Sequence, residues 1–346
     1  MQEIQTHEVI NCPVCRSEGF ILHKKLTDRL FNMPGFWDMK KCSNINCEAV
    51  WVSNAPIDSE ISKLYATYYT HKDSSDIKRE TSEKKVTFLD KIRSEHLYTT
   101  YGYDNPLSNW KYKLISKIAY IHPAWRENLE STVFYLSENK GKKLLEVGCG
   151  AGGTLESLTK KGWVTTGTDF DNEAVMNAKS KGLNVFYGEL IEQRFPDESF
   201  DVVVMSHVIE HVSHPVELLK ECRRILKKNG TLTLLTPNAN ARGFSYWGRN
   251  WFALDTPRHL QIFTPKSLAI IANKAGYTKI KTFSNMHLAI HIWQMSLGLA
   301  SDKNFSRNSS LSIIQKIYMQ FIVLILGWLN IFLPGRGEVA VLICKK

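Results

Sequence analysis

A glycine-rich loop is the first feature of the sequence with the means for chemistry. In LLEVGCGAGG, residues 144–153, Gly148, Gly150 and Gly153 give the spacing G-x-G-x-x-G, whereas Gly148, Gly150 and Gly152 give G-x-G-x-G. Such a loop opens a helix whose first backbone amides can bind an anionic part of a nucleotide ligand. The spacing alone fits more than one class of nucleotide ligand, and it also fits a loop that binds none.

Two carboxylates near this loop narrow the choice. Glu146 stands at the end of a predicted strand, two residues before Gly148, where it would repel a diphosphate. It suits a ligand that carries an ammonium and a sulfonium, and so favours S-adenosylmethionine (SAM). Asp169 ends the second predicted strand and can accept hydrogen bonds from both ribose hydroxyls. Both ligand classes need such an acid, so Asp169 does not discriminate between them.

Four of the seven cysteines lie near the N-terminus with the spacing C-x2-C and C-x4-C: Cys12, Cys15, Cys42 and Cys47. This pattern predicts a structural Zn²⁺ tetrahedron in a small ribbon, with no open position for catalysis. The first ten residues, MQEIQTHEVI, lack a basic segment followed by an apolar run, so we expect a cytoplasmic protein with reduced thiols. The expected compartment favours a metal over disulfides.

The histidines form two clusters. In SHVIEHVSHP, His207, Glu210 and His211 share one face of a helical turn. Three interpretations stay open for them: a catalytic acid/base set, a divalent-metal site, or a structural pairing of Glu210 with His211. The second cluster, WFALDTPRHLQIFTPKSL, places Asp255 and His259 in one loop. Histidine titrates near neutrality and therefore suits proton transfer.

Alternating strands and helices must position these groups. From Lys142 onward the pattern predicts five strands, at 142–147, 163–169, 183–189, 200–206 and 231–238. Helices are predicted between them, at 153–161, 172–182 and 217–230. Such a series indicates an α/β fold with a doubly wound parallel sheet, in which ligands bind outside the carboxyl ends of the strands. The glycine loop, Asp169 and His207 all fall at those ends.

The segments LLEVGCGAGGTL, GTDFDNEAV and YGELIEQRFPDESFDVVVMSHVIEHV follow one another in the order found in class I SAM-dependent methyltransferases, which this chain resembles from residue 144 to 238. The resemblance implies a Rossmann-like sheet of seven strands that ends in an antiparallel hairpin, with strands six and seven at 277–285 and 337–346. It also implies that Glu146 and the loop surround the methionine part of SAM, and that His207 faces the sulfonium. The implied cofactor residues are Glu146, Gly148, Gly150, Gly152, Asp169, Phe170, Glu189, Leu190 and Ser206.

The catalytic candidates are three histidines. The turn 207–211 is similar to the acid–x–x–Glu–His turn of ubiquinone-biosynthesis O-methyltransferases, implicated there in metal binding, with His207 in place of the first acid. The Pro-Arg-His-Leu run at 257–260 resembles sugar- and lipid-directed members. Transfer of a methyl group to a hydroxyl requires a positioned nucleophile and a base. His259 is the first choice and His207 the second, with His211 completing the set; the alternative for His259 is a loop anchor paired with Asp255.

Three regions are expected along the chain. Residues 1–55 form the zinc ribbon, 56–140 a helical linker or cap, and 141–346 the SAM-binding domain with insertions at 238–265 and 286–336. The formal charge of +10 lies entirely in residues 241–346, which hold 13 Lys or Arg and 3 Asp or Glu.

The second insertion contains IYMQFIVLILGWLNIFLP, residues 317–334, at the lower limit of length for crossing a bilayer. A true span would separate the seventh strand from its sheet. The segment 313–333 is therefore expected either to contact a membrane surface, helped by the basic charge, or to be a buried lid or dimer face.

The expected function is SAM-dependent methylation of a hydroxyl on a small molecule, sugar or lipid-linked glycan precursor, in polysaccharide biosynthesis. Two alternatives remain: an RNA methyltransferase, and a non-catalytic SAM-binding partner of a polysaccharide-assembly complex. Nucleic acid is disfavoured because residues 1–140 are nearly neutral, with 19 basic and 18 acidic side chains. The Asn/Asp-Pro-Pro-aromatic run of base methylation is also absent from the sequence.

Overall fold

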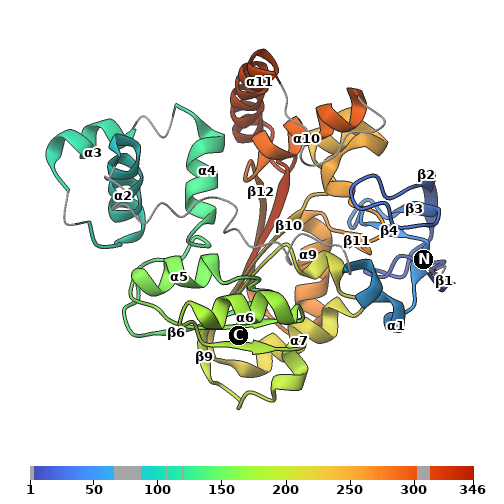
Figure 1. Cartoon of the computed structure of the whole chain (residues 1–346), viewed down its shortest axis with the longest axis horizontal. Helices are drawn as coiled ribbons and strands as arrows, with labels where there is room; N and C mark the ends of the chain where they lie inside the picture. Colours follow the sequence, from blue (N-terminus) through green and yellow to red (C-terminus); the bar gives the residue numbers. More distant parts are fainter. Residues whose placement is uncertain (1–3, 66–86, 106–107, 118–120, 302–311) are drawn as a thin grey trace.

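A seven-stranded mixed sheet lies at the centre of the computed structural model, which describes residues 4–65, 87–105, 108–117, 121–301 and 312–346 (Figure 1). In spatial order its strands are β12 (Thr278–Asn285), β13 (Val339–Lys345), β10 (Leu226–Pro237), β9 (Phe200–Ser206), β6 (Lys143–Val147), β7 (Val164–Asp169) and β8 (Val185–Tyr187). The five strands from β10 to β8 run parallel, and β13 runs antiparallel between β10 and β12. The predicted seven-stranded sheet with its antiparallel terminal hairpin is confirmed.

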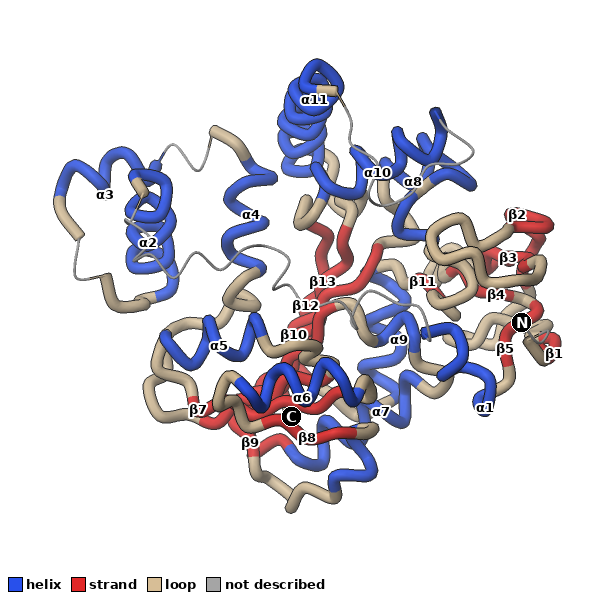
Figure 2. The backbone as a smooth tube through the Cα atoms, in the orientation of Figure 1, coloured by secondary structure: helices blue, strands red, loops and turns tan. Residues whose placement is uncertain are grey.

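Helices cover both faces of this sheet because its strands are apolar on both faces. Leu145 and Val203 pack against α7 (Pro215–Ile225) and α9 (Pro265–Lys274). Their neighbours Leu144 and Val204 point the other way and pack near α5 (Gly153–Lys160) and α4 (Pro123–Ser131). Figure 2 shows the strands between these two groups of helices, and α6 (Asn172–Ser180) packs beside β7 and β8. The sheet is therefore doubly wound, as predicted.

The helix predicted at 217–230 is shorter in the structure. Helix α7 ends at Ile225, and residues 226–230 already belong to β10. Leu226 is fully buried and pairs with Phe200 of β9. Burial of this side chain in the sheet overrides the helical spacing of the sequence, which continues to Gly230.

The region between the ribbon and the sheet is helical where the structure describes it. It contains α1 (Asp58–Ile61), the 3-10 helix η1 (Ser62–Tyr65), α2 (Phe88–Tyr101) and α3 (Trp110–Ser116). Helix α2 begins with a capping box between Thr87 and Asp90 and ends at Gly102, whose φ of 82° suits glycine. Parts of the predicted helical linker or cap, 56–140, lie outside the described residues.

The N-terminal region forms two small sheets. Strands β1 (Thr6–Glu8) and β5 (Asn54–Pro56) pair with each other. The second sheet has the order β11-β4-β3-β2, made of β2 (Gly19–Leu26), β3 (Trp37–Cys42), β4 (Val50–Val52) and β11 (Gln261–Ile262). Its fourth strand, β11, comes from the predicted insertion 238–265. The boundary at residue 55 stays a prediction, and this sheet joins residues from both sides of it.

Both insertions contain helices. The first contains α8 (Arg242–Trp247), η7 (Gly248–Asn250) and η8 (Phe252–Leu254). The second contains α10 (Ala289–Ser301) and α11 (Ile313–Phe332), and α11 stands apart from the ribbon strands in Figure 1. Helix α11 is long and apolar enough to cross a membrane, judged by length and composition alone. Core helices of soluble proteins and signal sequences can be equally long and apolar. Its packing is considered below.

Candidate functional site

The glycine loop leaves β6 in a backbone conformation that requires glycine. Gly148, Gly150 and Gly152 have φ values of 71°, 50° and 78°. A Cβ on Gly148 or Gly152 would lie 2.3 or 2.4 Å from a neighbouring side chain, so space as well as conformation excludes larger residues there. A Cβ on Gly150 would meet nothing within 4 Å. The loop thus leaves open space above Gly150, and the Gly150 amide donates to Asp169 Oδ2 at 2.7 Å.

Glu146 is fully buried beneath this loop. Thr154 hydrogen-bonds its carboxyl, but Oε2 has no partner among the described residues. Burial, reinforced by the charge of Asp169, raises the pKa of Glu146 to about 8. A buried carboxyl oxygen without a partner is costly, so it marks a place for a hydrogen-bond donor or a cation. The orphaned oxygen and the open glycine loop together fit the ammonium and sulfonium end of SAM.

The other predicted cofactor residues lie at the carboxyl ends of neighbouring strands. Asp169 is buried at the end of β7, accepts from the Asp171 amide at 2.9 Å, and has its pKa raised by burial. Phe170 beside it is half exposed, and Ser206 ends β9. Glu189 is exposed and caps η5 (Leu190–Gln193), whereas the Leu190 side chain is buried in the core cluster. Only the backbone of Leu190 is therefore available to a ligand.

Tyr65, at the end of η1, reaches this edge of the sheet from the N-terminal region. Its ring lies 5.0 Å from that of Phe170, centroid to centroid, in a T-shaped arrangement. Its hydroxyl lies 2.9 Å from Nδ1 of His211. Tyr65 therefore links the cofactor side to the histidine cluster. Sequence reasoning missed it, because a tyrosine in a predicted helical linker carries no signal of its own.

Glu210, in the 3-10 helix η6 (Ile209–His211), is the centre of the histidine cluster. Its Oε1 lies 3.2 Å from His207 Nδ1, and its Oε2 accepts from the Thr236 hydroxyl at 2.9 Å. Burial would raise its pKa, but the hydrogen bond from His207 and the nearby imidazoles of His211 and His259 outweigh burial and lower it to about 2. Glu210 is therefore a carboxylate and a hydrogen-bond acceptor.

His207 is a partly exposed member of the cluster. Because ionised Glu210 only accepts, His207 Nδ1 carries the proton and Nε2 carries the lone pair. This Nε2 has no partner in the part of the chain that the structure describes and is itself buried, although 28% of the side chain is exposed. The pair has the arrangement of a carboxylate–imidazole dyad with its basic nitrogen free.

His211 and His259 form the buried side of the cluster. His211 Nδ1 lies 3.1 Å from the Arg258 carbonyl, and His259 Nδ1 lies 2.8 Å from the Ala253 carbonyl. A carbonyl only accepts, so His259 Nδ1 carries a proton and its Nε2 is free to bind a cation, whereas His211 Nδ1 lies between the Arg258 carbonyl and the Tyr65 hydroxyl and can donate to one or accept from the other. Donor atoms of Glu210, His211 and His259 lie within 4.8 Å of one another. Burial, then the charge of His259, lowers the pKa of His211 to about 4.

Arg258 fixes the loop that carries His259. It is fully buried, and its Nη1 and Nη2 donate to the two carboxylate oxygens of Asp28 at 2.7 and 2.9 Å. Its Nε donates to Asp255 at 3.0 Å, whereas His259 Nε2 lies 4.0 Å from Asp255. The main anchor of this loop is thus the ribbon residue Asp28 acting through Arg258. Sequence reasoning missed Asp28, which lies 230 residues from its partner.

His287, just after β12, is a second residue that sequence reasoning missed. Its Nδ1 has no partner among the described residues. Burial, then the nearby charge of His207, lowers its pKa to about 3. His287 is therefore a neutral imidazole near His207, with a buried Nδ1 that has no partner among the described residues. A lone histidine in an apolar segment gives no functional signal in the sequence.

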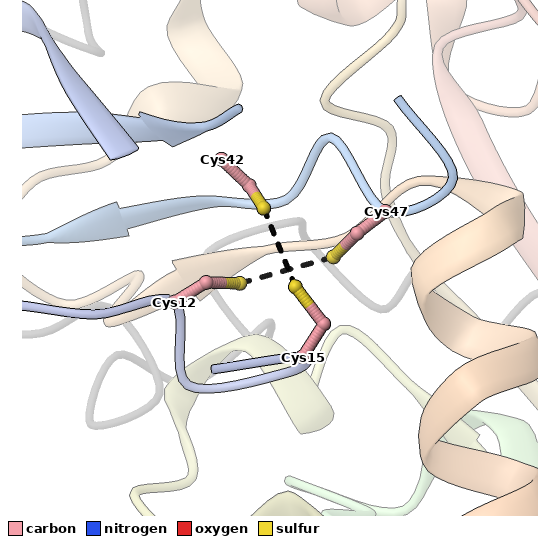
Figure 3. A group of neighbouring side chains, drawn as sticks. All are labelled: Cys12, Cys15, Cys42 and Cys47. Atoms are coloured by element: carbon pink, nitrogen blue, oxygen red, sulfur yellow. Dashed lines mark hydrogen bonds between the residues drawn. The ribbon is translucent and has the colours of Figure 1, made fainter. Parts of the chain in front are cut away.

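The four N-terminal cysteines point at one another (Figure 3). The sulfurs of Cys12 and Cys47 are 3.8 Å apart, and those of Cys15 and Cys42 are 3.4 Å apart. A tetrahedral zinc with bonds of about 2.3 Å places its sulfurs about 3.8 Å apart. The predicted set therefore converges and fits Zn²⁺. The turn that carries Cys47 also contacts residues 251–264, here called the histidine loop. The contact is a hydrogen bond of 2.6 Å from the Thr264 hydroxyl to the Cys47 carbonyl.

Comparison with known proteins agrees with this geometry. The family described as "Methyltransferase domain" matches residues 118–282. A ubiquinone biosynthesis O-methyltransferase from Glaesserella parasuis is 32% identical over 115 residues, covering 30% of this chain and 49% of that protein. One from Cereibacter sphaeroides is 28% identical over 181 residues, covering 49% of this chain and 72% of that protein.

The chain thus spans about half the length of the first of these relatives. Among solved structures, a SAM-dependent methyltransferase from Archaeoglobus fulgidus is 22% identical with a TM-score of 0.44, covering 69% of this chain and all of that one. The strand order, the glycine loop with Glu146, and the family match agree. Residues 118–282 therefore match a methyltransferase domain, and over this part the chain is similar to SAM-dependent O-methyltransferases.

Proposed function

We propose that this protein transfers the methyl group of SAM to a hydroxyl group, with His207 as the base. The observation that carries the proposal is the dyad of Glu210 and His207, whose free Nε2 lies at the carboxyl end of β9, next to the strand of the glycine loop. The acceptor oxygen would attack the methyl carbon while the bond from carbon to sulfur breaks. The hydroxyl proton passes to His207 Nε2, and S-adenosylhomocysteine leaves as a neutral thioether.

This assignment reverses the order of preference drawn from the sequence. His259 is only 6% exposed, and its Nε2 points toward Glu210 at 3.9 Å. The His207 side chain is 28% exposed, against 8% for His259, and its Nε2 has no partner among the described residues, so His207 is the better candidate for the base. In this proposal His259 and His211 hold Glu210 as a carboxylate, and Glu210 stabilises the imidazolium that forms on His207.

A second candidate role for the cluster is divalent-metal binding. The donor set of Glu210, His211 and His259 favours it, since two imidazoles and one carboxylate are common ligands of such ions. A cation held there would act as a Lewis acid toward the acceptor hydroxyl. Against it, Glu210 already uses one oxygen for His207 and the other for Thr236. Activity that survives exhaustive chelation, with the zinc content unchanged, would exclude this role.

The acceptor we propose is a sugar or lipid-linked glycan precursor of polysaccharide biosynthesis, methylated in the cytoplasm or at a membrane. The similarity of the Pro-Arg-His-Leu run to sugar- and lipid-directed members supports it, as does the apolar, basic insertion. The similarity to ubiquinone biosynthesis O-methyltransferases supports an oxygen acceptor. We further propose that the four cysteines hold one structural Zn²⁺.

The experiment that tests this function supplies labelled SAM and the full chain to a cell extract. Label in lipid or aqueous saccharide supports the proposal, and its loss in His207→Ala ties it to this site. His214→Ala is the matched control, because His214 lies nearby but is 73% exposed. Label in nucleic acid would favour the RNA methyltransferase alternative. Tight SAM binding with no labelled product would favour the non-catalytic partner.

A further inference from the structure

Helix α11 carries a continuous stripe of exposed apolar side chains. Their exposed fractions lie between 39% and 76%: Ile313, Ile317, Phe321, Ile325, Trp328 and Phe332. Steps of four or three residues place them on one side of a helix. The opposite side is attached to the domain along the helix, at Met319, Val323, Gly327 and Asn330, which are buried. Exposed apolar faces of this length usually mark a contact surface.

The ends of α11 are basic. From residue 312 to 336 the sequence contains Lys316 and Arg336 and no acidic residue. Arg242 of α8 donates to the carbonyls of Leu329 and Leu333 at 3.4 and 3.3 Å, which places a third cation beside the last turn. These three cations and the exposed stripe are here called the α11 surface.

Two aromatic side chains border the α11 surface. Tyr246 of α8 is 71% exposed. Trp328 donates through its indole nitrogen to the Ile121 carbonyl at 3.1 Å, and Ile121 adds a further apolar side chain that is 62% exposed. Tyrosine and tryptophan are favoured where an apolar phase meets a polar one.

The packing of α11 fixes its orientation to a membrane. Strands β12 and β13, which flank the insertion, pair with each other through Asn285 and Val339. The Asn330 amide group binds Ser284 of β12, through its own oxygen and nitrogen, at 3.2 Å each. A helix that spans a bilayer would lose these contacts and those of Met319 and Val323. With one side held by protein and the other exposed, α11 is arranged to lie in the plane of an interface.

We propose that the α11 surface binds the headgroup and upper acyl region of an anionic lipid bilayer. The absence of acidic residues between 312 and 336 complements negatively charged headgroups. A second copy of the chain fits less well, because a twofold contact would bring Lys316, Arg242 and Arg336 against the same cations of the partner. The proposal goes beyond methyl transfer, which needs no membrane, so either can fail without the other.

The test is cosedimentation of the full chain with vesicles of phosphatidylcholine, alone or with phosphatidylglycerol. We expect binding to the anionic vesicles that weakens with salt. The double variant Ile317→Glu, Phe321→Glu should bind them about tenfold less or weaker still, since it removes apolar area and adds negative charge. Met176→Glu is the matched control, because Met176 is 60% exposed on α6, away from the α11 surface. It should bind as the parent does.

Three results would overturn the proposal. The parent could bind neither vesicle, or both equally well. The double variant could bind like the parent while its SAM affinity and circular dichroism show that it is folded. The parent could form a dimer that the double variant does not form, with no vesicle binding, which would make the surface an interface between two copies. Lys316→Glu, which leaves the apolar stripe intact, should weaken binding to the anionic vesicles only.

Discussion

The carboxylate of Asp28 and the guanidinium of Arg258 form a buried, bidentate ion pair, in which Nη1 and Nη2 lie 2.7 and 2.9 Å from the two carboxylate oxygens. It joins the turn after β2 to the loop that presents His259. Through this ion pair, the N-terminal region fixes the position of the loop that carries His259, and so stabilises one side of the histidine cluster.

Replacing Asp28 by Asn should be severely destabilising. The change removes one of the two carboxylates that the described residues place against buried Arg258, and a broken buried pair costs about 3 to 5 kcal/mol. Urea unfolding followed by fluorescence measures the change. Asp104→Asn is the control, since Asp104 and its partner Lys140 are both mostly exposed, and it should cost under about 1 kcal/mol. Equal losses for the two variants would contradict a structural role for the buried pair.

Zinc removal should loosen the histidine loop. Cys47 binds Thr264 through its carbonyl, and β4 pairs with β11 immediately after His259. We expect one zinc per tag-free chain by metal analysis, and faster proteolytic cleavage within residues 251–264 after its removal by a chelator or by Cys15→Ser. Protein purified without zinc, or a cleavage rate that does not change, would disprove this link.

Loss of the His207 imidazole should abolish turnover without affecting cofactor binding. In His207→Asn the base is gone, and kcat should fall by about a hundredfold to ten-thousandfold. The Kd for SAM, measured by calorimetry, should stay within about twofold, because the carboxylates of Glu146 and Asp169 that we expect to bind the cofactor lie on β6 and β7. His259→Gln should lower stability as well as turnover, since its Nδ1 anchors the loop. Unchanged turnover in His207→Asn would transfer the role of base to another residue.

SAM affinity should rise with pH through about 8. Burial holds Glu146 protonated below that pKa, and a cationic ligand needs the carboxylate. Affinity at pH 7 should therefore be about tenfold weaker than its plateau at high pH, since about nine in ten carboxyls are protonated there. Calorimetry across this range measures the slope. Glu146→Gln should bind more weakly with a flat profile, whereas Glu156→Gln, on the outer part of α5, should keep the slope.

The sequence predicts the sheet and the cofactor loop because their signals are local. Glycines with positive φ, a run such as FDVVVMS, and an acid at a strand end all appear within a few residues of one another. The strand order follows from the family resemblance and is confirmed by the pairing of β13 between β10 and β12. The cysteine cluster was likewise predictable, because each of its two pairs, C-x2-C and C-x4-C, is a short-range pattern.

The histidine cluster was only partly predictable, since its geometry is made by contacts between distant segments. The spacing of the residues in the sequence predicts that Glu210 and His211 lie together. It cannot show that the side chain of His207 is more exposed than that of His259. Tyr65 and Asp28 reach the site from the N-terminal region, so no pattern within a few residues of the histidines could predict their contacts with the cluster. The helix predicted at 217–230 is too long for a related reason. Its last residues belong to strand β10, where Leu226 is buried by contacts with distant segments.

The pairing of β11 with β4 also has a consequence for the order of folding. Val50 pairs with Ile262, so the edge of β4 stays open until more than half of the chain has left the ribosome. The cysteine knuckles, by contrast, lie within the first 47 residues and can take up metal early. A metal-loaded N-terminal segment with an unpaired strand edge is then the species most exposed to aggregation during synthesis, and residues 261–262 are the stretch that closes it.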